Sequence, residues 1–361
     1  MADTVFANGI YVESGLSNIL DTSLVGIAND ADVMESLQAY QGMKSALGFI
    51  DTPFISKDQK YMAKVGPTEL DRINEGENKK IKSMSYGPKK GFEIKEWANK
   101  IGIGYLSYQY LKKSKTLMGA SDTVKQEFAN LAEQTKELVQ SDFLTKRYEM
   151  VKLFTSGNVE TASYGPGSAT PNGEPLFDTA HPYLNGAATF SNYTTNSLTD
   201  ANLQTALNTL KTGVRAQNGK YVSGNRFKLV VGRVLAVTAR NILQTTGNTV
   251  GMYAGAGTST TRDTLVNTFS YKGNIVELVE VNEIGELLND GTTLGNAYNW
   301  FVINPEYIAK MKALRTFELY PTTLTSYKND DNDDMYVSVR SSFAVDHFGA
   351  EAWVFWSFAT S

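Results

Sequence analysis

The chain has 361 residues, which is enough for two domains or one large elaborated domain with a sizeable apolar core. The chain has 34 lysine and arginine residues and 38 acidic residues. The resulting formal net charge of −4 does not indicate tight binding to nucleic acid. The absence of cysteine excludes disulfides, thiolate zinc sites and a cysteine nucleophile. Because neither a basic leader followed by an apolar run nor about 18 consecutive apolar residues occurs, we expect a soluble protein in a reducing compartment.

The first hundred residues contain little that predicts a core. Residues 1–50 carry short mixed segments and a weak helical pattern at 32–47, which we interpret as an arm. In residues 57–100 lysine and arginine outnumber acids 11 to 7, and glycine and proline breakers interrupt the segment. Because few large apolar side chains occur there, we expect a projecting hairpin that needs a neighbouring molecule.

The clearest helix signal follows a strand-like alternation at 92–105. Its apolar stripe at three- and four-residue spacing consists of Val124, Phe128, Leu131, Thr135 and Leu138. The pattern continues to Gly157, a natural stop, and predicts a helix roughly 50 Å long at about 1.5 Å per residue. A coiled-coil member is the alternative, but no other long helical pattern accompanies it, so we interpret it as a spine helix crossing a sheet.

The second half of the chain predicts a separate α/β layer. A polar loop region at 157–197 precedes a helix at 199–213, a short buried strand at 227–231 and a helix at 233–243. Asn304-Pro305 is a helix start, a cap followed by proline at the first helical position. Further strand patterns lie at 274–281, 300–303, 336–343 and 352–358.

Three motifs resemble binding sites only superficially. The glycine-rich loop 247–262 lacks the Gly-Lys-Ser/Thr of a phosphate loop, so we interpret it as a connector. The acidic run 330–334 lacks the glycine and the closing glutamate of a calcium loop, which favours a solvated turn. Asn192 begins a glycosylation acceptor motif that has no meaning without secretion.

Two pairs of residues are candidates for catalysis, Asp178 with His181 and Asp346 with His347. Adjacent residues on a strand point to opposite faces, so the second pair does not converge if that segment is extended. The first pair lacks a nucleophile elbow and a zinc-binding pattern. Since no nucleophile, base and charge stabiliser converge, we expect no enzyme activity, no cofactor and no metal.

One stretch carries a family resemblance. Residues 173–182 read GEPLFDTAHP, and SLTDANLQTALNTL and FKLVVGRVLAVTARNIL follow. Together with the order of elements, these segments resemble the major capsid proteins of tailed bacteriophages, which have the Hong Kong 97 fold. Within that group the chain is similar to the Mu-type major head subunits. The resemblance covers residues 85–245 by motif and the rest by architecture.

The resemblance implies an α+β, Hong Kong 97-like capsid fold. Its parts are an N-terminal arm, an extended β-hairpin loop, a long spine helix with a peripheral sheet, and an α/β axial domain. The expected bounds are 1–50 for the arm, 51–96 for the loop, 97–197 for the peripheral domain with the spine helix at about 121–156, 198–296 for the axial domain, and 297–361 for a return to the peripheral domain.

The resemblance also implies a function and partners. The expected protein self-assembles into hexamers and pentamers of an icosahedral shell that encloses packaged double-stranded DNA with weak contact. Portal, scaffolding and decoration proteins are the expected further partners, the location is the virion, and assembly takes place in the host cytoplasm. An encapsulin-type shell around a cargo enzyme is one alternative, and a soluble hydrolase using Asp178 and His181 is another.

Three groups of residues receive structural roles in this reading. Leu176 and Phe177 would anchor the polar loop to the core, with His181 and Pro182 shaping the turn beside them. The axial loop at the capsomer centre would contain Gly251, Gly255 and Gly257. The charged residues of the inter-subunit extended loop are Lys57, Lys60, Lys64, Arg72, Lys79, Lys80, Lys82, Lys89 and Lys90.

Overall fold

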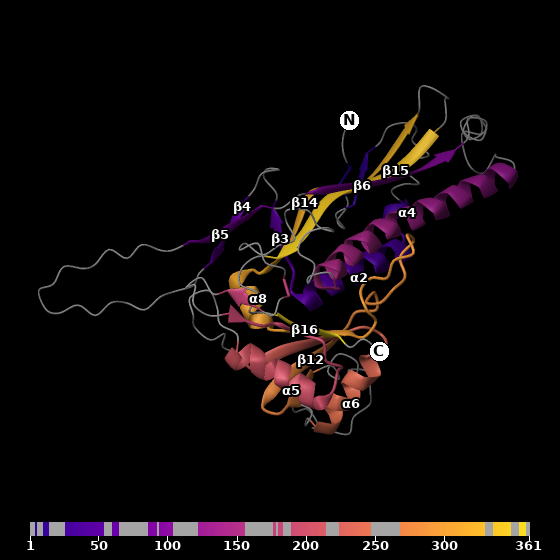
Figure 1. Cartoon of the computed structure of the whole chain (residues 1–361). Coiled ribbons are helices and arrows are strands. Elements are labelled where there is room, and N and C mark those ends of the chain that lie inside the picture. Colours follow the sequence, from indigo (N-terminus) through magenta and orange to yellow (C-terminus); the bar gives the residue numbers. More distant parts are fainter. Residues whose placement is uncertain are drawn as a thin grey trace, which may run out of the picture.

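The computed structural model describes residues 4–5, 10–13, 26–53, 60–64, 86–91, 94–103, 122–155, 176–177, 180–182, 189–213, 224–246, 268–328, 335–347 and 354–358. These residues form an elongated upper lobe and a smaller lower lobe, each built on a six-stranded sheet (Figure 1). Helices and strands are mixed in both lobes, so the fold is α+β as predicted.

The upper sheet is dominated by two long antiparallel strands, β14 (Leu314–Lys328) and β15 (Met335–His347). Their register shifts twice, between Glu318 and Tyr320 and between Tyr320 and Thr323. The remaining strands are β1 (Thr4–Val5), β2 (Tyr11–Glu13), β3 (Ile50–Pro53) and β6 (Lys95–Ile103), in the order β1-β2-β14-β15-β6 with β3 also on β14.

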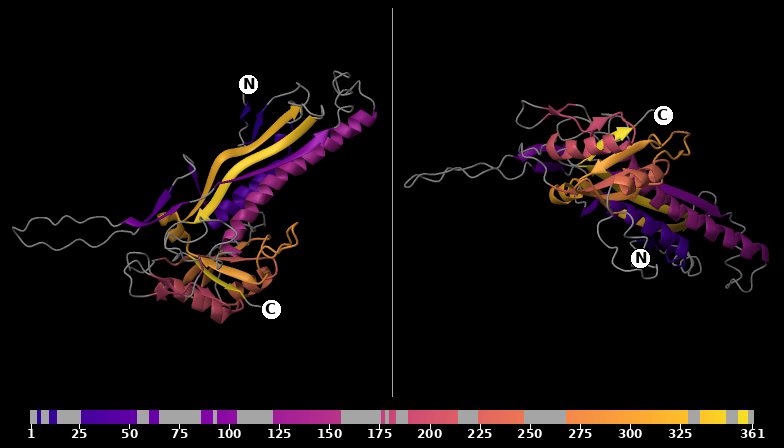
Figure 2. Two further views of the ribbon diagram at one scale, coloured as in Figure 1. Left: turned by 45° about the horizontal axis from the view of Figure 1, so that its top comes forward. Right: turned by 90° about the horizontal axis from the view of Figure 1, so that it is seen from below.

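Two helices lie side by side against this sheet, α2 (Ala31–Leu47) and the 34-residue α4 (Asp122–Thr155) (Figures 1 and 2). The spine helix predicted at about 121–156 is therefore present as α4. By contrast, α2 is not part of an arm, because its buried Val33 and Leu37 share a core cluster with Phe143 of α4. The sequence alone does not reveal this packing, because the partner helix lies about a hundred residues away along the chain.

The lower sheet has the strand order β11-β12-β10-β13-β16-β9. Its first three strands are β11 (Thr268–Tyr271), β12 (Asn274–Glu280) and β10 (Arg226–Val231), of which the last two are parallel. The helices of this lobe are α5 (Asp200–Asn208), continued by η3 (Thr209–Gly213), and α6 (Ala236–Thr246). Thr199 caps α5 as predicted, because its side chain accepts a hydrogen bond from the Asn202 amide.

Three strands outside the predicted 198–296 range complete the lower sheet: β9 (Tyr193–Thr194), β13 (Asn299–Ile303) and β16 (Val354–Phe358). The return to the peripheral domain, expected from residue 297, therefore begins only after β13, and the chain comes back to the lower lobe in β16. The sequence predicted a strand at 300–303, and all five residues of β13 are buried. It did not reveal which sheet the strand joins, because pairing depends on distant partners.

A short helix leads from one lobe to the other. Asn304 caps α8 (Pro305–Met311) by accepting a hydrogen bond from the Tyr307 amide at 3.1 Å, with proline at the first position as predicted. The chain then enters β14. Two two-stranded sheets stand apart from the large ones, β4 (Lys60–Lys64) with β5 (Tyr86–Gly91), and β7 (His181–Pro182) with β8 (Thr189–Phe190).

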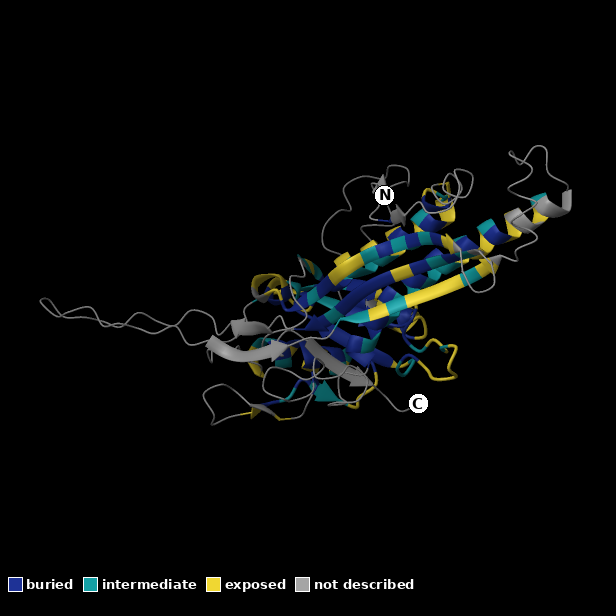
Figure 3. Ribbon diagram, turned by 90° about the horizontal axis from the view of Figure 1, so that it is seen from above, coloured by how far each residue is buried: buried dark blue, intermediate teal, exposed yellow. Residues whose placement is uncertain are grey.

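The end of the spine helix joins the two cores. Phe143 and Val139 lie in the upper cluster with Val337 and Val339, whereas Met150 and Phe154 belong to the lower cluster. Figure 3 shows buried residues along the middle of the upper sheet and exposed ones along β6, its outer strand. One continuous helix thus contributes side chains to both lobes, which fixes their spacing.

Candidate functional site

The residues proposed for catalysis are placed as follows. Asp346 and His347 are both buried at the end of β15, and the His347 amide donates to the Asp346 carboxylate at 2.8 Å. Asp178 and the acidic run 330–334 lie outside the described residues. Within the described part of the chain, no group of three or more histidine, cysteine or acidic residues is arranged to hold a metal ion.

The polar loop is attached to the core at Leu176 and Phe177, which are 0% and 1% exposed. The Phe177 ring lies 5.9 Å from that of Phe301 in β13. Asn192, also fully buried, donates from its side-chain amide to the Leu176 carbonyl at 2.8 Å. In the sequence, Asn192 is visible only as the start of a glycosylation acceptor motif. Such a local motif does not reveal the contact with Leu176, which lies 16 residues away.

His181 and Pro182, expected to shape the turn beside the anchor, lie on a short strand. They make up β7 and pair antiparallel with β8, where His181 lies opposite Phe190 and Pro182 opposite Thr189. A histidine–proline pair has no strong local preference for a turn, since proline also suits a short edge strand. Residues 183–188, between β7 and β8, lie outside the described residues.

Of the charged residues assigned to the extended loop, Lys60, Lys64, Lys89 and Lys90 lie on β4 and β5. These strands form a two-stranded antiparallel sheet of their own, at the end of the upper lobe away from the tip of α4 (Figure 1). The other loop residues, Lys57, Arg72, Lys79, Lys80 and Lys82, and the axial glycines Gly251, Gly255 and Gly257 lie outside the described residues.

A buried polar cluster fastens the spine helix to the upper sheet. The Lys146 ammonium donates to Glu318 and to the Thr322 hydroxyl, both at 2.9 Å, and lies 3.4 Å from Asp142. Asp142 in turn accepts hydrogen bonds from the hydroxyls of Thr322 and Ser341. Glu318 and Thr322 flank the irregular part of β14, so this cluster holds the distorted strand against the helix.

The surroundings of this cluster are apolar. The ammonium of Lys146 lies 5.6 Å from the ring centres of Phe143 and Phe343 and 5.8 Å from that of Tyr40. Burial, followed by the nearby carboxylates, raises the pKa of the Tyr40 hydroxyl, so this group stays neutral. The spacing of Asp142 and Lys146, four residues apart on a helix, was visible in the sequence, but their sheet partners were not.

Polar contacts also connect the two lobes. Arg147 of α4 forms an ion pair with the buried Glu283, which follows β12. Burial lowers the pKa of the Arg147 guanidinium, although neighbouring Glu286 opposes this effect. Lys228 of β10 donates to the carbonyl of Ala46 in the last turn of α2, where a cation is favoured by the helix dipole.

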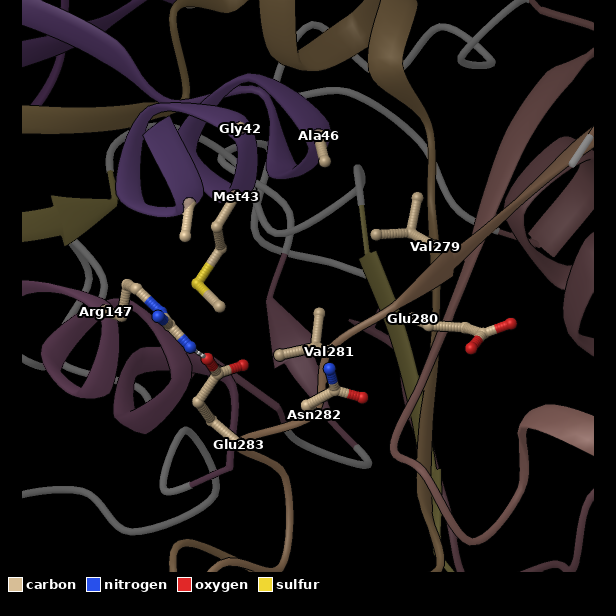
Figure 4. Close-up of a pocket in the computed structure, with 10 residues that line it drawn as sticks. Gly42, Met43, Ala46, Arg147, Val279, Glu280, Val281, Asn282 and Glu283 are labelled. Carbon is tan, nitrogen blue, oxygen red and sulfur yellow. Dashed lines mark ion pairs between the residues drawn. The ribbon is translucent and has the colours of Figure 1, made fainter. Parts of the chain in front are cut away.

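These contacts border a cleft of about 290 Å³ between α2 and the end of β12. In Figure 4 the side chain of Met43 from α2 extends into this space, and Val281 lies across from it, with the Arg147–Glu283 ion pair at one side. Small and apolar side chains line the cleft together with the charged and amide side chains of Arg147, Glu280, Asn282 and Glu283. The cleft lies at the seam between the two lobes.

Two glycines fix the segment that follows β12 against the spine helix. Gly295 has φ of +75°, and a Cβ on it would lie 2.5 Å from Cβ of Thr155, the last residue of α4. Gly285 has φ of +82°, and its Cβ would lie 2.7 Å from the Ala297 backbone. Both positions therefore require glycine for conformation and for space.

Taken together, the described residues form a two-lobed unit braced by one long helix, with a separate two-stranded hairpin. This is the architecture of capsid subunits with the Hong Kong 97 fold. The chain belongs to the phage capsid protein family, whose match spans residues 149–354, more than half of its length. No curated protein sequence matches the chain.

Solved phage structures resemble this fold at low sequence identity. A structure from Mycobacterium phage Patience aligns with a TM-score of 0.50 and 11% identity over 91% of this chain and 86% of that chain. A structure from Gordonia phage Cozz aligns with a TM-score of 0.45 and 12% identity, over 90% of this chain and 86% of that chain. A procapsid structure of bacteriophage JBD30 aligns with a TM-score of 0.39 and 13% identity, over 96% of this chain and 77% of that chain.

Proposed function

We propose that this chain is the major capsid protein of a tailed bacteriophage, which assembles as hexamers and pentamers into an icosahedral shell around packaged DNA. The observation that carries this proposal is the two-lobed unit, whose lobes are held apart at a fixed spacing by α4, within a phage capsid family. A shell requires many identical rigid units, and the two cores that share the continuous helix α4 supply such rigidity.

The hairpin of β4 and β5 is proposed to contact a neighbouring subunit. Among the described strands these two pair only with each other, and an isolated two-stranded hairpin is marginally stable in water. Contact with another subunit would stabilise it. Lys60, Lys64, Lys89 and Lys90 on its strands, with Lys57, Arg72, Lys79, Lys80 and Lys82, would then face an acidic surface of that neighbour.

Two further roles remain proposals. The loop with Gly251, Gly255 and Gly257 is assigned to the capsomer centre by its place between α6 and β11. Leu176 and Phe177 are assigned as the anchor of the polar loop, a role supported by their burial and by the hydrogen bond from Asn192.

The proposed partners follow from this role. Portal, scaffolding and decoration proteins would bind the shell, and the enclosed double-stranded DNA would be held weakly, in keeping with the net charge of −4. The proposed location is the virion, after assembly in the host cytoplasm, with no catalytic activity. None of the described helices is both long and apolar enough to span a bilayer.

Deleting residues 57–90 tests the proposed role of the hairpin. The lobes keep their own cores, so we expect the variant to fold with a cooperative thermal transition close to that of the full chain. Because the contact between subunits is removed, it should sediment as a monomer where the full chain forms capsomers or shells. Assembly of the deletion variant at wild-type concentrations would refute this role.

A further inference from the structure

A hydrogen-bonded hairpin projects from the lower lobe after β12, at residues 285–294. Its two arms are joined by hydrogen bonds from the Gly285 amide to the Leu294 carbonyl, from Leu294 to Glu286 and from Leu288 to Thr292, at 2.7–2.9 Å. The Asp290 carboxylate closes the turn by accepting from the amide and the hydroxyl of Thr292. The conformation of this hairpin, which we call the β12 hairpin, is thus fixed locally.

The base of the β12 hairpin is fixed as well. Ile284 and Leu294 are buried, and Gly285 and Gly295 fit against Ala297 and Thr155 without room for a side chain. The neighbouring Glu283 is paired with Arg147 of the spine helix. The hairpin therefore stands in one orientation on the end of α4, which is what a preorganised binding element requires.

The tip of this rigid element is apolar and acidic. Leu287 is 67% exposed, the most exposed large hydrophobic residue of the described chain, while Leu288 beside it packs onto the core. Two exposed acidic residues belong to the same hairpin, Glu286 directly before Leu287 on one arm and Asp290 in the turn. An exposed leucine with acidic residues nearby suits a shallow apolar surface with basic residues at its rim.

The same subunit carries a surface of that kind on α6 and the turn before it. Val237 in the first turn of α6 is 64% exposed, and Val234 in the turn that precedes the helix is 53% exposed. Arg240 follows Val237 by three residues on the helix, and Arg233 directly precedes Val234 in the turn. Arg240 pairs with Glu280, and Arg233 makes no ion pair with any described residue. We call this the α6 face.

The β12 hairpin and the α6 face do not touch within one subunit, since Leu287 and Val237 both remain largely exposed. We propose that the β12 hairpin of one subunit docks onto the α6 face of the next copy, with Leu287 against Val234 and Val237 and the acids beside Arg233. Two different surfaces then meet head to tail, as in contacts that close a ring. This inference rests on the proposed function, because it requires that copies assemble.

Paired cysteines test the contact directly, because the native chain contains none. In the variant carrying both Leu287→Cys and Val237→Cys, mild oxidation of assembled protein should give a ladder of disulfide-linked multimers. Each single variant should give none, because a disulfide needs Cα atoms within about 7 Å. Multimers from Leu287→Cys alone would indicate a symmetric contact, and an absence of multimers from the double variant would overturn the proposal.

A charge exchange provides an independent test in solution. Glu286→Arg and Arg233→Glu should each raise the protein concentration needed for assembly about tenfold, and the double variant should restore it. Burial and the nearby Glu286 carboxylate raise the pKa of the Tyr148 hydroxyl in the same chain, so Tyr148→Phe is the control and should assemble normally. If Tyr148→Phe fails to assemble, or if the double variant is not restored, the proposed pairing is wrong.

These outcomes separate the inference from the proposed function. If the wild-type chain forms no capsomers or shells under any condition, the proposed function itself fails. If the wild type assembles while Leu287→Ser and Val237→Ser assemble equally well and the cysteine pair does not crosslink, the function stands and only the contact between the β12 hairpin and the α6 face is refuted.

Discussion

At the residue scale, Lys146 is the most consequential buried charge among the described residues. It lies 2% exposed among aromatic rings and balances the buried carboxylate of Asp142. Such a pair adds little stability compared with apolar residues of the same volume, because both charges lose water. Removing only one of the two charges is different, because the other charge then remains buried without its counterpart.

We therefore expect Lys146→Met to destabilise the subunit by about 3–5 kcal/mol. The matched control is Lys136→Met on the same helix, which breaks ion pairs with Asp30 and Glu133 nearer the surface. That control should change the free energy of unfolding far less, because ion pairs near the surface are screened by solvent. Urea denaturation of the monomer measures both, and equal losses would show that the buried cluster has no special importance.

A second residue-scale prediction concerns pH. Burial raises the pKa of the Asp51 carboxyl, but hydrogen bonds from Lys44 and Thr316, both at 2.6 Å, outweigh it, so the net pKa is lowered. A carboxyl with a lowered folded-state pKa stabilises the fold above its unfolded pKa of about 3.9, and that stability is lost as the pH falls through the folded value.

Asp51→Asn should accordingly be less stable than the wild type at pH 7, and the difference should shrink below about pH 4. Because Asp51 is largely exposed, we expect a difference of no more than about 1 kcal/mol at pH 7. Chemical denaturation at pH 7 and pH 3 measures it. A difference in stability between the two proteins that stays constant between these pH values would contradict the lowered pKa of Asp51.

At the element scale, the β12 hairpin depends on glycines with different surroundings. Gly295 and Gly291 have nearly the same φ, +75° and +79°. A Cβ atom added to Gly295 would clash with Thr155, whereas one added to Gly291 would point into open space. Gly291→Ala should cost about 1–2 kcal/mol through its backbone conformation alone. Gly295→Ala should cost about 1–3 kcal/mol more, because the end of α4 must shift.

Thermal unfolding of the two glycine variants separates these contributions, since backbone strain is common to both. A larger loss at Gly295 would show that the β12 hairpin is pressed against the spine helix. Equal losses would mean that the segment moves away from Thr155 without penalty, and the β12 hairpin would then lack the fixed base that its proposed contact requires.

The elements that the sequence predicted well are those with local causes. The stripe of α4, the Thr199 cap and the Asn304-Pro305 start each depend on residues within a few positions of one another. The sheet to which a strand belongs has no local cause, and this is why β13 and β16 were expected in the wrong lobe. Similarly, Asp142 and its partners Thr322 and Ser341 are 180 and 199 residues apart.

At the scale of the whole molecule, the subunit is two sheets on one continuous helix. α4 enters the upper core at Val139 and Phe143 and the lower core at Met150 and Phe154, and the Arg147–Glu283 ion pair lies between these layers. Relative motion of the lobes would disrupt both cores. This rigidity, and the surfaces it holds in place, suits a protein whose contacts with other copies matter more than any chemistry.

The most direct test of the central claim is negative-stain electron microscopy of the purified full-length chain across concentration and ionic strength. We predict closed shells of uniform diameter, or rings of five and six subunits where closure is incomplete, since head-to-tail contacts between identical rigid units close on themselves. A population of folded monomers under all of these conditions would contradict the assignment of this chain as a shell-forming subunit.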